Sequence, residues 1–296
     1  PTFEIANGTC GENLTWVLDS DGLLKVSGTG AMADYDWENK APWYENRLKI
    51  KAVEIAEGVT SIGDDAFDYC QNLTSVMIPN SVTSIGVSAF FRCDKLSSII
   101  IPNSVVKISN SAFAYCTSLT EVSIPAGTTD ISGAIFRGCE KLTSINVDEA
   151  NPNYKSIDGV LFTKDGKTLI NYPAGKGEEP YIIPNGVISI LDSAFERCKF
   201  SGITLPASLI DIGYADTFPD SIKNISVDAA NPNYKSVDGV LFTKDGKSLI
   251  KYPADKSGET YTVPDGVVII RRDAFKYCSN LKNITMPNGV KSIRYG

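Results

Sequence analysis

The residues best equipped for nucleophilic or metal chemistry are seven cysteines, six of which recur at one position of a repeated pattern. Zinc sites place cysteines in close pairs such as CxxC, whereas these six are 23 or more residues apart. The chain has no histidine, which removes Ser-His-Asp and Cys-His nucleophiles, HExxH metalloproteases and every histidine-liganded metal. The six cysteines are Cys70, Cys93, Cys116, Cys139, Cys198 and Cys278.

This spacing instead predicts a stacked column of small buried side chains. Adjacent β rungs lie about 5 Å apart, a distance that a disulfide tolerates, but stacked side chains point in parallel rather than toward each other. We therefore expect the thiols of the column to be reduced and inaccessible. Cys10 lies outside the repeat, and its redox state stays open.

Acidic and amide side chains give two weaker signals of metal binding. The run Asp19-Ser20-Asp21-Gly22 resembles the start of an EF-hand loop, but it lacks the third acidic ligand and the distal glutamate, so a hairpin turn is expected. The oxygen-rich run of Asp148, Glu149, Asn151 and Asn153 fits either calcium or ordinary turn and cap chemistry. We predict no metal site and no cofactor, with calcium at these loops as the open alternative.

A repeat of 23 residues organises the elements that carry these groups. It begins at Val59 with VTSIGDDAFDYCQNLTSVMIPNS and recurs from Val82 and Val105, with apolar residues at matching positions. Such a period predicts a solenoid, because one coil cannot bury its own apolar face and must stack on its neighbours. We expect an α/β repeat solenoid, a right-handed superhelix rich in β-strand, with short helical or 3₁₀ turns at the AFxxC segments such as Asp64–Tyr69. About ten parallel strands are expected, near Val53, Val76, Ile99, Val122, Ile145, Ile182, Ile203, Ile225, Tyr261 and Ile284.

Two inserts and an N-terminal segment interrupt the repeat. Residues 148–186 and 228–266 align at an offset of 80 residues, and each carries a DGVLFTKDGK run that predicts a β-hairpin. Residues 1–42 predict a β-hairpin cap, since a solenoid needs an end piece that stops further stacking. The solenoid itself is then predicted to span 43–296.

The pattern AFxxCxxLxxIxIPxxVxxIG resembles the leucine-rich repeat of the BspA-like bacterial surface proteins, from about Trp43 to Gly296. The runs from Cys10 to Trp16 and from Gly28 to Met32 are similar to the N-terminal caps of that group. The resemblance implies an exported protein of host-associated bacteria that adheres to host matrix proteins or other cells. It therefore implies a location on the cell surface or outside the cell, and the start at Pro1 fits removal of a signal peptide.

Composition limits the partners. The chain of 296 residues has 28 basic and 35 acidic residues, for a formal charge of −7, which disfavours nucleic acid. No apolar run approaches the roughly 18 residues that a membrane span needs. Along the expected outward face, only Glu54 and Glu121 are acidic, and their backbones should lie about 14 Å apart at about 4.8 Å per rung. That separation is too wide for the paired carboxylates of a glycosidase.

We therefore predict a non-enzymatic recognition or adhesion module that binds a protein through the solenoid surface, with glycan binding as the alternative. The oligomeric state is left open. A glycan site would need exposed aromatic residues, and only Tyr154 and Tyr234 of the inserts offer them near the outward face. The candidate partner-binding residues lie on the face that lines the concave side of leucine-rich repeats, and they are Ser75, Met77, Ser98, Ile100, Glu121, Ser123 and Asn146.

Overall fold

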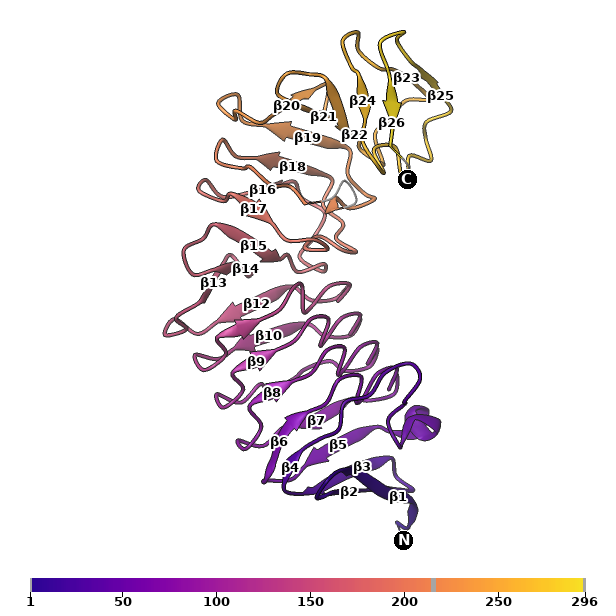
Figure 1. The fold of residues 1–296 in the computed structure, drawn as a ribbon, viewed down its shortest axis with the longest axis vertical. Helices are drawn as coiled ribbons and strands as arrows, with labels where there is room; N and C mark the ends of the chain where they lie inside the picture. Colours follow the sequence, from indigo (N-terminus) through magenta and orange to yellow (C-terminus); the bar gives the residue numbers. More distant parts are fainter. Residues whose placement is uncertain (1, 214–216, 295–296) are drawn as a thin grey trace. The chain divides into compact units, whose positions relative to one another are not determined.

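The computed structural model describes residues 2–213 and 217–294. Pro1, where the predicted cap begins, and Gly296, where the predicted solenoid ends, therefore lie outside the described residues. The chain forms two compact units. Unit 1 comprises Pro1–Asp165 with Ile170–Lys176, and unit 2 comprises Gly166–Leu169 with Gly177–Gly296. In both units short strands follow one another as stacked rungs (Figure 1). The expected solenoid is confirmed in each.

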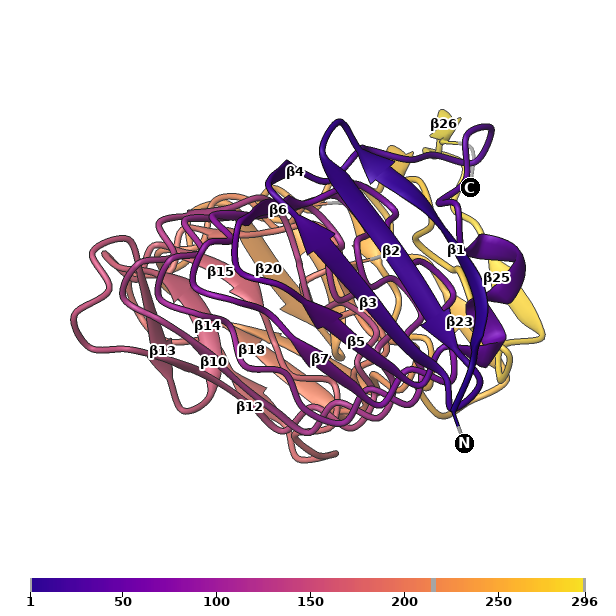
Figure 2. The same ribbon diagram turned by 90° about the horizontal axis from the view of Figure 1, so that it is seen from below.

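The first sheet of unit 1 starts with antiparallel strands and continues with parallel ones, which lie side by side in Figure 2. The turn between its second and third strands is held by Asp19, whose Oδ1 accepts hydrogen bonds from the backbone N–H groups of Asp21 and Leu23. The acidic run there is therefore a hairpin turn, as expected. The strands, in sheet order, are β1 (Glu4–Gly11), β2 (Leu14–Asp19), β3 (Leu23–Gly28), β5 (Ala52–Ile55) and β7 (Ser75–Met77).

Two further parallel sheets belong to unit 1. In the longer one, equivalent isoleucines of successive repeats pair directly, as Ile62 does with Ile85 and Ile85 with Ile108. Its strands are β4 (Gly30–Ala31), β6 (Val59–Ile62), β8 (Ser84–Ile85), β9 (Lys107–Ile108) and β11 (Asp130–Ile131). The other consists of β10 (Glu121–Ile124) and β12 (Ser144–Val147).

The first insert forms the expected extended segments. Strands β13 (Tyr154–Ile157) and β14 (Val160–Thr163) pair antiparallel, and β15 (Thr168–Asn171) follows the turn. Asn151 explains the oxygen-rich sequence before them. Its Nδ2 donates to the carbonyls of Pro125 and Thr128, and its Oδ1 accepts from the backbone N–H groups of Asn153 and Tyr154. Turn chemistry uses this amide fully.

Unit 2 repeats the same plan with its own parallel and antiparallel strands. In the second insert, Asn231 makes the same four kinds of hydrogen bond as Asn151 does in the first. The strands are β16 (Tyr181–Ile182), β17 (Ser189–Ile190), β18 (Gly202–Leu205), β19 (Asn224–Val227), β20 (Tyr234–Val237), β21 (Val240–Thr243), β22 (Ser248–Lys251), β23 (Thr260–Thr262), β24 (Ile269–Ile270), β25 (Asn283–Thr285) and β26 (Ser292–Ile293).

The predicted helical turns are wrong, and with them the α/β class. The one helix whose bounds the structure gives is the 3₁₀ segment η1 (Tyr44–Lys49), outside the AFxxC turns. In the turn Asp64–Tyr69 the backbone is left-handed at Asp65 (φ 49°) and Tyr69 (φ 55°), which interrupts any right-handed helix. The N–H groups of Phe67 and Tyr69 instead donate to carbonyls of the next repeat, those of Ala89 and Phe91. These bonds between rungs alternate with local bonds, such as that from the N–H of Asp68 to the carbonyl of Asp65, so no continuous helix forms.

The core of unit 1 is a stack of aromatic rings, as the repeat predicts. Successive ring centroids are 5.3–5.5 Å apart and the planes are nearly parallel. Trp43 extends the stack toward the N-terminus, and its indole Nε1 donates to the carbonyl of Ala66 at 2.7 Å. The stacked residues are Trp43, Phe67, Phe90, Phe113 and Phe136, and all are fully buried.

Candidate functional site

The cysteine column offers no reactive thiol. None of the seven cysteines, all within the described residues, forms a disulfide, and those of unit 1 are buried. Cys93, Cys116 and Cys139 each donate through Sγ to a carbonyl of the preceding repeat, at 3.3, 3.2 and 3.1 Å. Burial raises the pKa of Cys139 to about 12, and burial also raises the pKa of Cys93 and of Cys116 well above the usual value of a thiol. Because the thiolate is the nucleophile, these cysteines are structural.

Exposure of the other cysteines differs from expectation. Cys10, whose state the sequence left open, is 3% exposed, and burial raises its pKa to about 11. Cys278 is the half-buried one. In the described residues no group of three or more Cys, Asp or Glu side chains is arranged to hold a metal ion.

The predicted partner-binding residues do come together on one face of unit 1. Strands β3, β5 and β7 pair in parallel so that Lys25, Glu54 and Met77 stand in one row across the sheet. Lys25 Nζ lies 3.4 Å from a carboxylate oxygen of Glu54. Met77 is 63% exposed and Ile100 is 82% exposed. We call this surface the outward sheet face.

Two shallow hollows mark the outward sheet face. The first has a volume of about 340 Å³ and the second of about 660 Å³, and Ile100 lines both. Every predicted residue lines one of them. The first contains Ser75 and Met77 beside Glu54, and the second contains Ser98, Glu121, Ser123 and Asn146.

A missing strand separates β7 from β10. Nine of the ten parallel strands expected from the repeat form. The exception is the strand expected near Ile99, since Ser98–Ile101 has no strand conformation. Ile99 and Ile101 nonetheless remain buried, so the alternation of side chains persists and Ile100 still points outward. The sheet is thus interrupted beside the two exposed apolar side chains.

Glu121 is less isolated than the sequence indicated. Asn146 Nδ2 donates to Glu121 Oε1, and Ser144 Oγ donates to Asn146 Oδ1 at 2.9 Å. Carboxylates nevertheless dominate the charge of this face. The hollows of the outward sheet face and the neighbouring one around Pro79 are lined by Glu54, Glu57, Glu121 and Asp148, against a single lysine, Lys25.

The insert tyrosines do not supply a glycan platform. Tyr154 is 9% exposed and its hydroxyl accepts from the backbone N–H of Ile131. Tyr234 is 8% exposed and its hydroxyl donates to the carbonyl of Ile210. The expectation that these two rings present a sugar-binding surface is therefore wrong, because both are buried and hydrogen-bonded to the backbone of a neighbouring coil.

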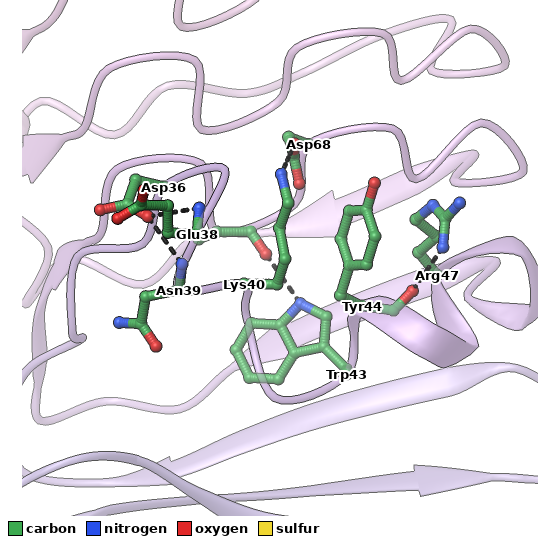
Figure 3. Close-up of polar contacts among 9 residues, drawn as sticks. Asp36, Glu38, Asn39, Lys40, Trp43, Tyr44, Arg47 and Asp68 are labelled. Carbon is green, nitrogen blue, oxygen red and sulfur yellow. Dashed lines mark hydrogen bonds and ion pairs between the residues drawn. The ribbon is translucent and has the colours of Figure 1, made fainter.

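The sequence reasoning overlooked a second set of aromatic and basic side chains at the turns. Figure 3 shows its first members, where the Tyr44 ring lies between Lys40 and Arg47. Lys40 Nζ is 4.8 Å and Arg47 Cζ 4.0 Å from the ring centroid, and Lys40 also pairs with the buried Asp68 at 3.8 Å. Burial raises the pKa of Asp68, and the charges of Lys40 and Arg47 oppose that rise. In the loop before them Trp37 is 77% exposed.

Further members of this set lie within the repeat motif itself. Each of the first four repeats has at least one aromatic or basic residue between the phenylalanine and the cysteine of AFxxC, and these are Tyr69, Phe91, Arg92, Tyr115 and Arg137. The phenylalanine and cysteine recur unchanged, whereas the residue types between them vary from repeat to repeat, so the period alone does not reveal them.

Comparison with known proteins places these features in context. The profile described as "BspA type Leucine rich repeat region" matches six copies, over residues 40–166, 179–251 and 252–296. No functionally curated protein matches the chain. No helix within residues 2–213 and 217–294 is long and apolar enough to cross a membrane.

Solved structures of bacterial leucine-rich-repeat proteins share the fold. A leucine-rich repeat protein from Eubacterium ventriosum has a TM-score of 0.67 at 25% identity, covering 97% of this chain and 87% of its own. A leucine rich cell surface protein from Faecalibacterium prausnitzii has a TM-score of 0.51 at 23% identity, covering 98% and 72%. The pneumococcal vaccine antigen PcpA has a TM-score of 0.50 at 17% identity, covering 97% and 93%.

Proposed function

Because the chain belongs to the BspA-type leucine-rich-repeat family, we propose that it is a non-enzymatic recognition module that binds a protein of a host or neighbouring cell through its outward sheet face. The proposal includes a location on the bacterial surface or outside the cell. The description of the Faecalibacterium relative as a cell surface protein supports that location.

The observation that carries the proposal is the exposure of two adjacent apolar side chains. Met77 and Ile100 line the same hollow and are 63% and 82% exposed, on a face otherwise made of small polar and acidic residues. Single exposed apolar residues are ordinary, but two that share a hollow at the centre of a face resemble the anchors of protein interfaces. Neither side chain contributes burial to the core, so a partner explains them best.

The surrounding charges define the partner further. Glu54, Glu57, Glu121 and Asp148 border the hollows, and Lys25 alone opposes them. Complementary charge steers association and excludes partners of like charge. The partner should therefore present an apolar side chain flanked by lysine or arginine.

Strands β1, β2 and β3 support the proposed role of the N-terminal segment as a cap. They pair antiparallel with one another, while β3 pairs in parallel with β5, the first strand of the array. The outermost strand, β1, is mostly exposed or half-buried. Such a polar end piece stops further stacking of coils.

The absence of catalysis is supported by the chemistry of the available side chains. Histidine is absent, the column thiols of unit 1 are buried with raised pKa, and Glu121 is hydrogen-bonded to Asn146. Binding is what remains for the outward sheet face.

The test is a binding screen of the purified chain against host matrix proteins, followed by the double variant Met77→Ser with Ile100→Ser. We expect the variant to keep its melting temperature within a degree or two and to lose most of its affinity for any protein captured. Ile210→Ser is the matched control, because Ile210 is also exposed (61%) but lies off the outward sheet face. Undiminished binding by the double variant would refute the proposal.

A further inference from the structure

A strip of alternating aromatic and cationic side chains runs along the AFxxC turns of unit 1. The Tyr69, Phe91 and Tyr115 rings contact one another edge to face, with centroids 5.5 Å apart at each step. Two guanidinium groups lie among these rings. We call this set, Tyr69, Phe91, Arg92, Tyr115 and Arg137, the turn-side strip.

The two arginines are held in position by the rings. Arg92 Cζ lies 5.8 Å from the Tyr69 centroid and 5.3 Å from that of Tyr115, and Arg137 Cζ lies 5.8 Å from the Tyr115 centroid. Cation–π contact orients a guanidinium without using its five N–H donors. Both groups are thus ordered and keep hydrogen-bonding capacity.

No protein group satisfies that capacity. Among the described residues, neither arginine has a carboxylate oxygen within 4 Å, and the buried Nε of Arg137 has no acceptor. Burial raises the pKa of Asp94, and the charge of Arg92 and a hydrogen bond with the Gln71 side chain oppose that rise, so Arg92 acts on Asp94 without forming an ion pair with it. An ordered guanidinium without an anion is a ready partner for a carboxylate, which it binds through two parallel hydrogen bonds.

The backbone of the strip is in a costly conformation. Tyr69, Arg92 and Tyr115 have φ of 55°, 55° and 59°, the left-handed region that glycine occupies without penalty. In the fourth repeat the same position is indeed glycine, Gly138, and a Cβ there would lie 2.6 Å from the Tyr115 ring. Bulky side chains therefore occupy three positions where glycine would cost less, and the glycine of the next coil leaves room for the last ring.

From these observations we infer that the turn-side strip binds a carboxylated glycan. The exposed or half-buried rings at one-rung spacing offer electron-rich faces to the C–H groups of sugar rings, and Arg92 and Arg137 receive the carboxylates. Tyr69 is the most accessible ring, at 39% exposed. The net charge of −7 disfavours densely charged polyanions, so a sugar polymer with spaced carboxylates fits better than nucleic acid or a heavily sulfated chain. This site is distinct from the outward sheet face.

The test measures binding of the full chain to immobilised hyaluronate, with neutral dextran, heparin, poly-glutamate and single-stranded DNA as comparison probes. We expect hyaluronate to bind in preference to all four, with an affinity that falls as salt is raised. The double variant Arg92→Gln with Arg137→Gln should lose about tenfold or more of that affinity. Arg92→Lys should lose part of it, because lysine keeps the charge but not the planar fork.

Three controls separate the strip from general effects. Arg294→Gln removes the same charge from an exposed position elsewhere and should change nothing. Tyr69→Ala leaves the charge unchanged and should weaken hyaluronate but not poly-glutamate. The Met77→Ser and Ile100→Ser variant should bind hyaluronate normally, which distinguishes this site from the proposed protein-binding face. Absence of hyaluronate binding, equal binding of poly-glutamate, or full binding by the double arginine variant would each overturn the inference.

Discussion

The repeats of unit 1 and the last complete repeat of unit 2 have the same motif but different degrees of burial. Phe113 is 0% exposed and stacks between Phe90 and Phe136, with interplanar angles of 1° and 18°. Its counterpart Phe275 is half-buried and meets Tyr252 and Tyr261 at tilts of 31° and 56°. The same motif thus gives a fully buried core in unit 1 and a partly exposed core at Phe275 in unit 2, because the burial of each coil depends on its neighbours.

The cysteines follow the same division. Cys116 and Cys139 are 0% exposed and donate to carbonyls of the preceding coil at 3.2 and 3.1 Å. Cys278 is half-buried, and its corresponding contact, to the carbonyl of Tyr252, is 3.8 Å. A motif therefore specifies which side chain faces the core, whereas the next coil decides how well it is sealed.

Replacing Phe113 by Ala should have the largest effect on stability. The loss of a fully buried ring and the resulting cavity should lower the free energy of unfolding by about 3–5 kcal/mol. Chemical denaturation followed by circular dichroism measures this loss. An unchanged midpoint would contradict the stacked register of the aromatic column.

Replacing Phe275 by Ala should cost less, about 1–2 kcal/mol, because part of the ring is already in water and the site can relax. The same denaturation experiment applies. A cost equal to that of Phe113→Ala would show that the last repeat is sealed in solution, and the contrast between the two regions would disappear.

At one buried position the two inserts differ in charge, because Asn171 in the first corresponds to Lys251 in the second. Lys251 is 2% exposed, and its Nζ donates to the carbonyls of Asp273 and Lys276. Burial lowers the pKa of Lys251 below its ordinary 10.5. Between the lowered pKa and 10.5 the unfolded chain binds more protons than the folded one, so this residue makes stability rise with pH in that window.

The free energy of unfolding of the variant Lys251→Asn should therefore exceed that of the parent by the largest margin at neutral pH. This margin should shrink as pH approaches 10.5. Unfolding midpoints of the variant and the parent, measured between neutral pH and pH 10.5, test this dependence on pH. Lys247→Asn, at an exposed position of the same insert, is the control and should give no such slope. Parallel stability curves for Lys251→Asn and the parent would refute the expectation.

The smallest expected difference between the two regions is in thiol accessibility. It should appear as a difference in the rate of thiol modification, with little effect on the stability of the protein. A thiol reagent should modify Cys278 first in the native protein, and all seven cysteines should react after denaturation without reductant. Cys278→Ser should remove the early phase. Recovery of fewer than seven thiols from the denatured chain would indicate cross-linked coils, and early modification of Cys10 would contradict its burial.

The amino-acid sequence was sufficient for the architecture of the array. Phe67, Phe90, Phe113 and Phe136 recur every 23 residues, and apolar side chains at such a period can be buried only if the coils stack in register. Nine of the ten expected strands followed from the same period. The direction in which Met77 and Ile100 point was predictable too, since alternation along each rung sends every second side chain outward.

Tertiary structure decided the rest, because it depends on contacts between coils. In the AFxxC segments of unit 1, alternate N–H groups such as those of Phe67 and Tyr69 donate to the next coil, a partner that no local pattern reveals, and this interrupts any helix. The missing strand at Ser98–Ile101, the hollows around Ile100 and the hydrogen bond from the Ile131 N–H to the Tyr154 hydroxyl likewise depend on neighbouring rungs. The sequence by itself determined which side chains face inward. Only the stacking of coils decided which of the others meet, since pairs such as Tyr69 with Phe91 and Arg92 with Tyr115 come from residues 22 and 23 positions apart.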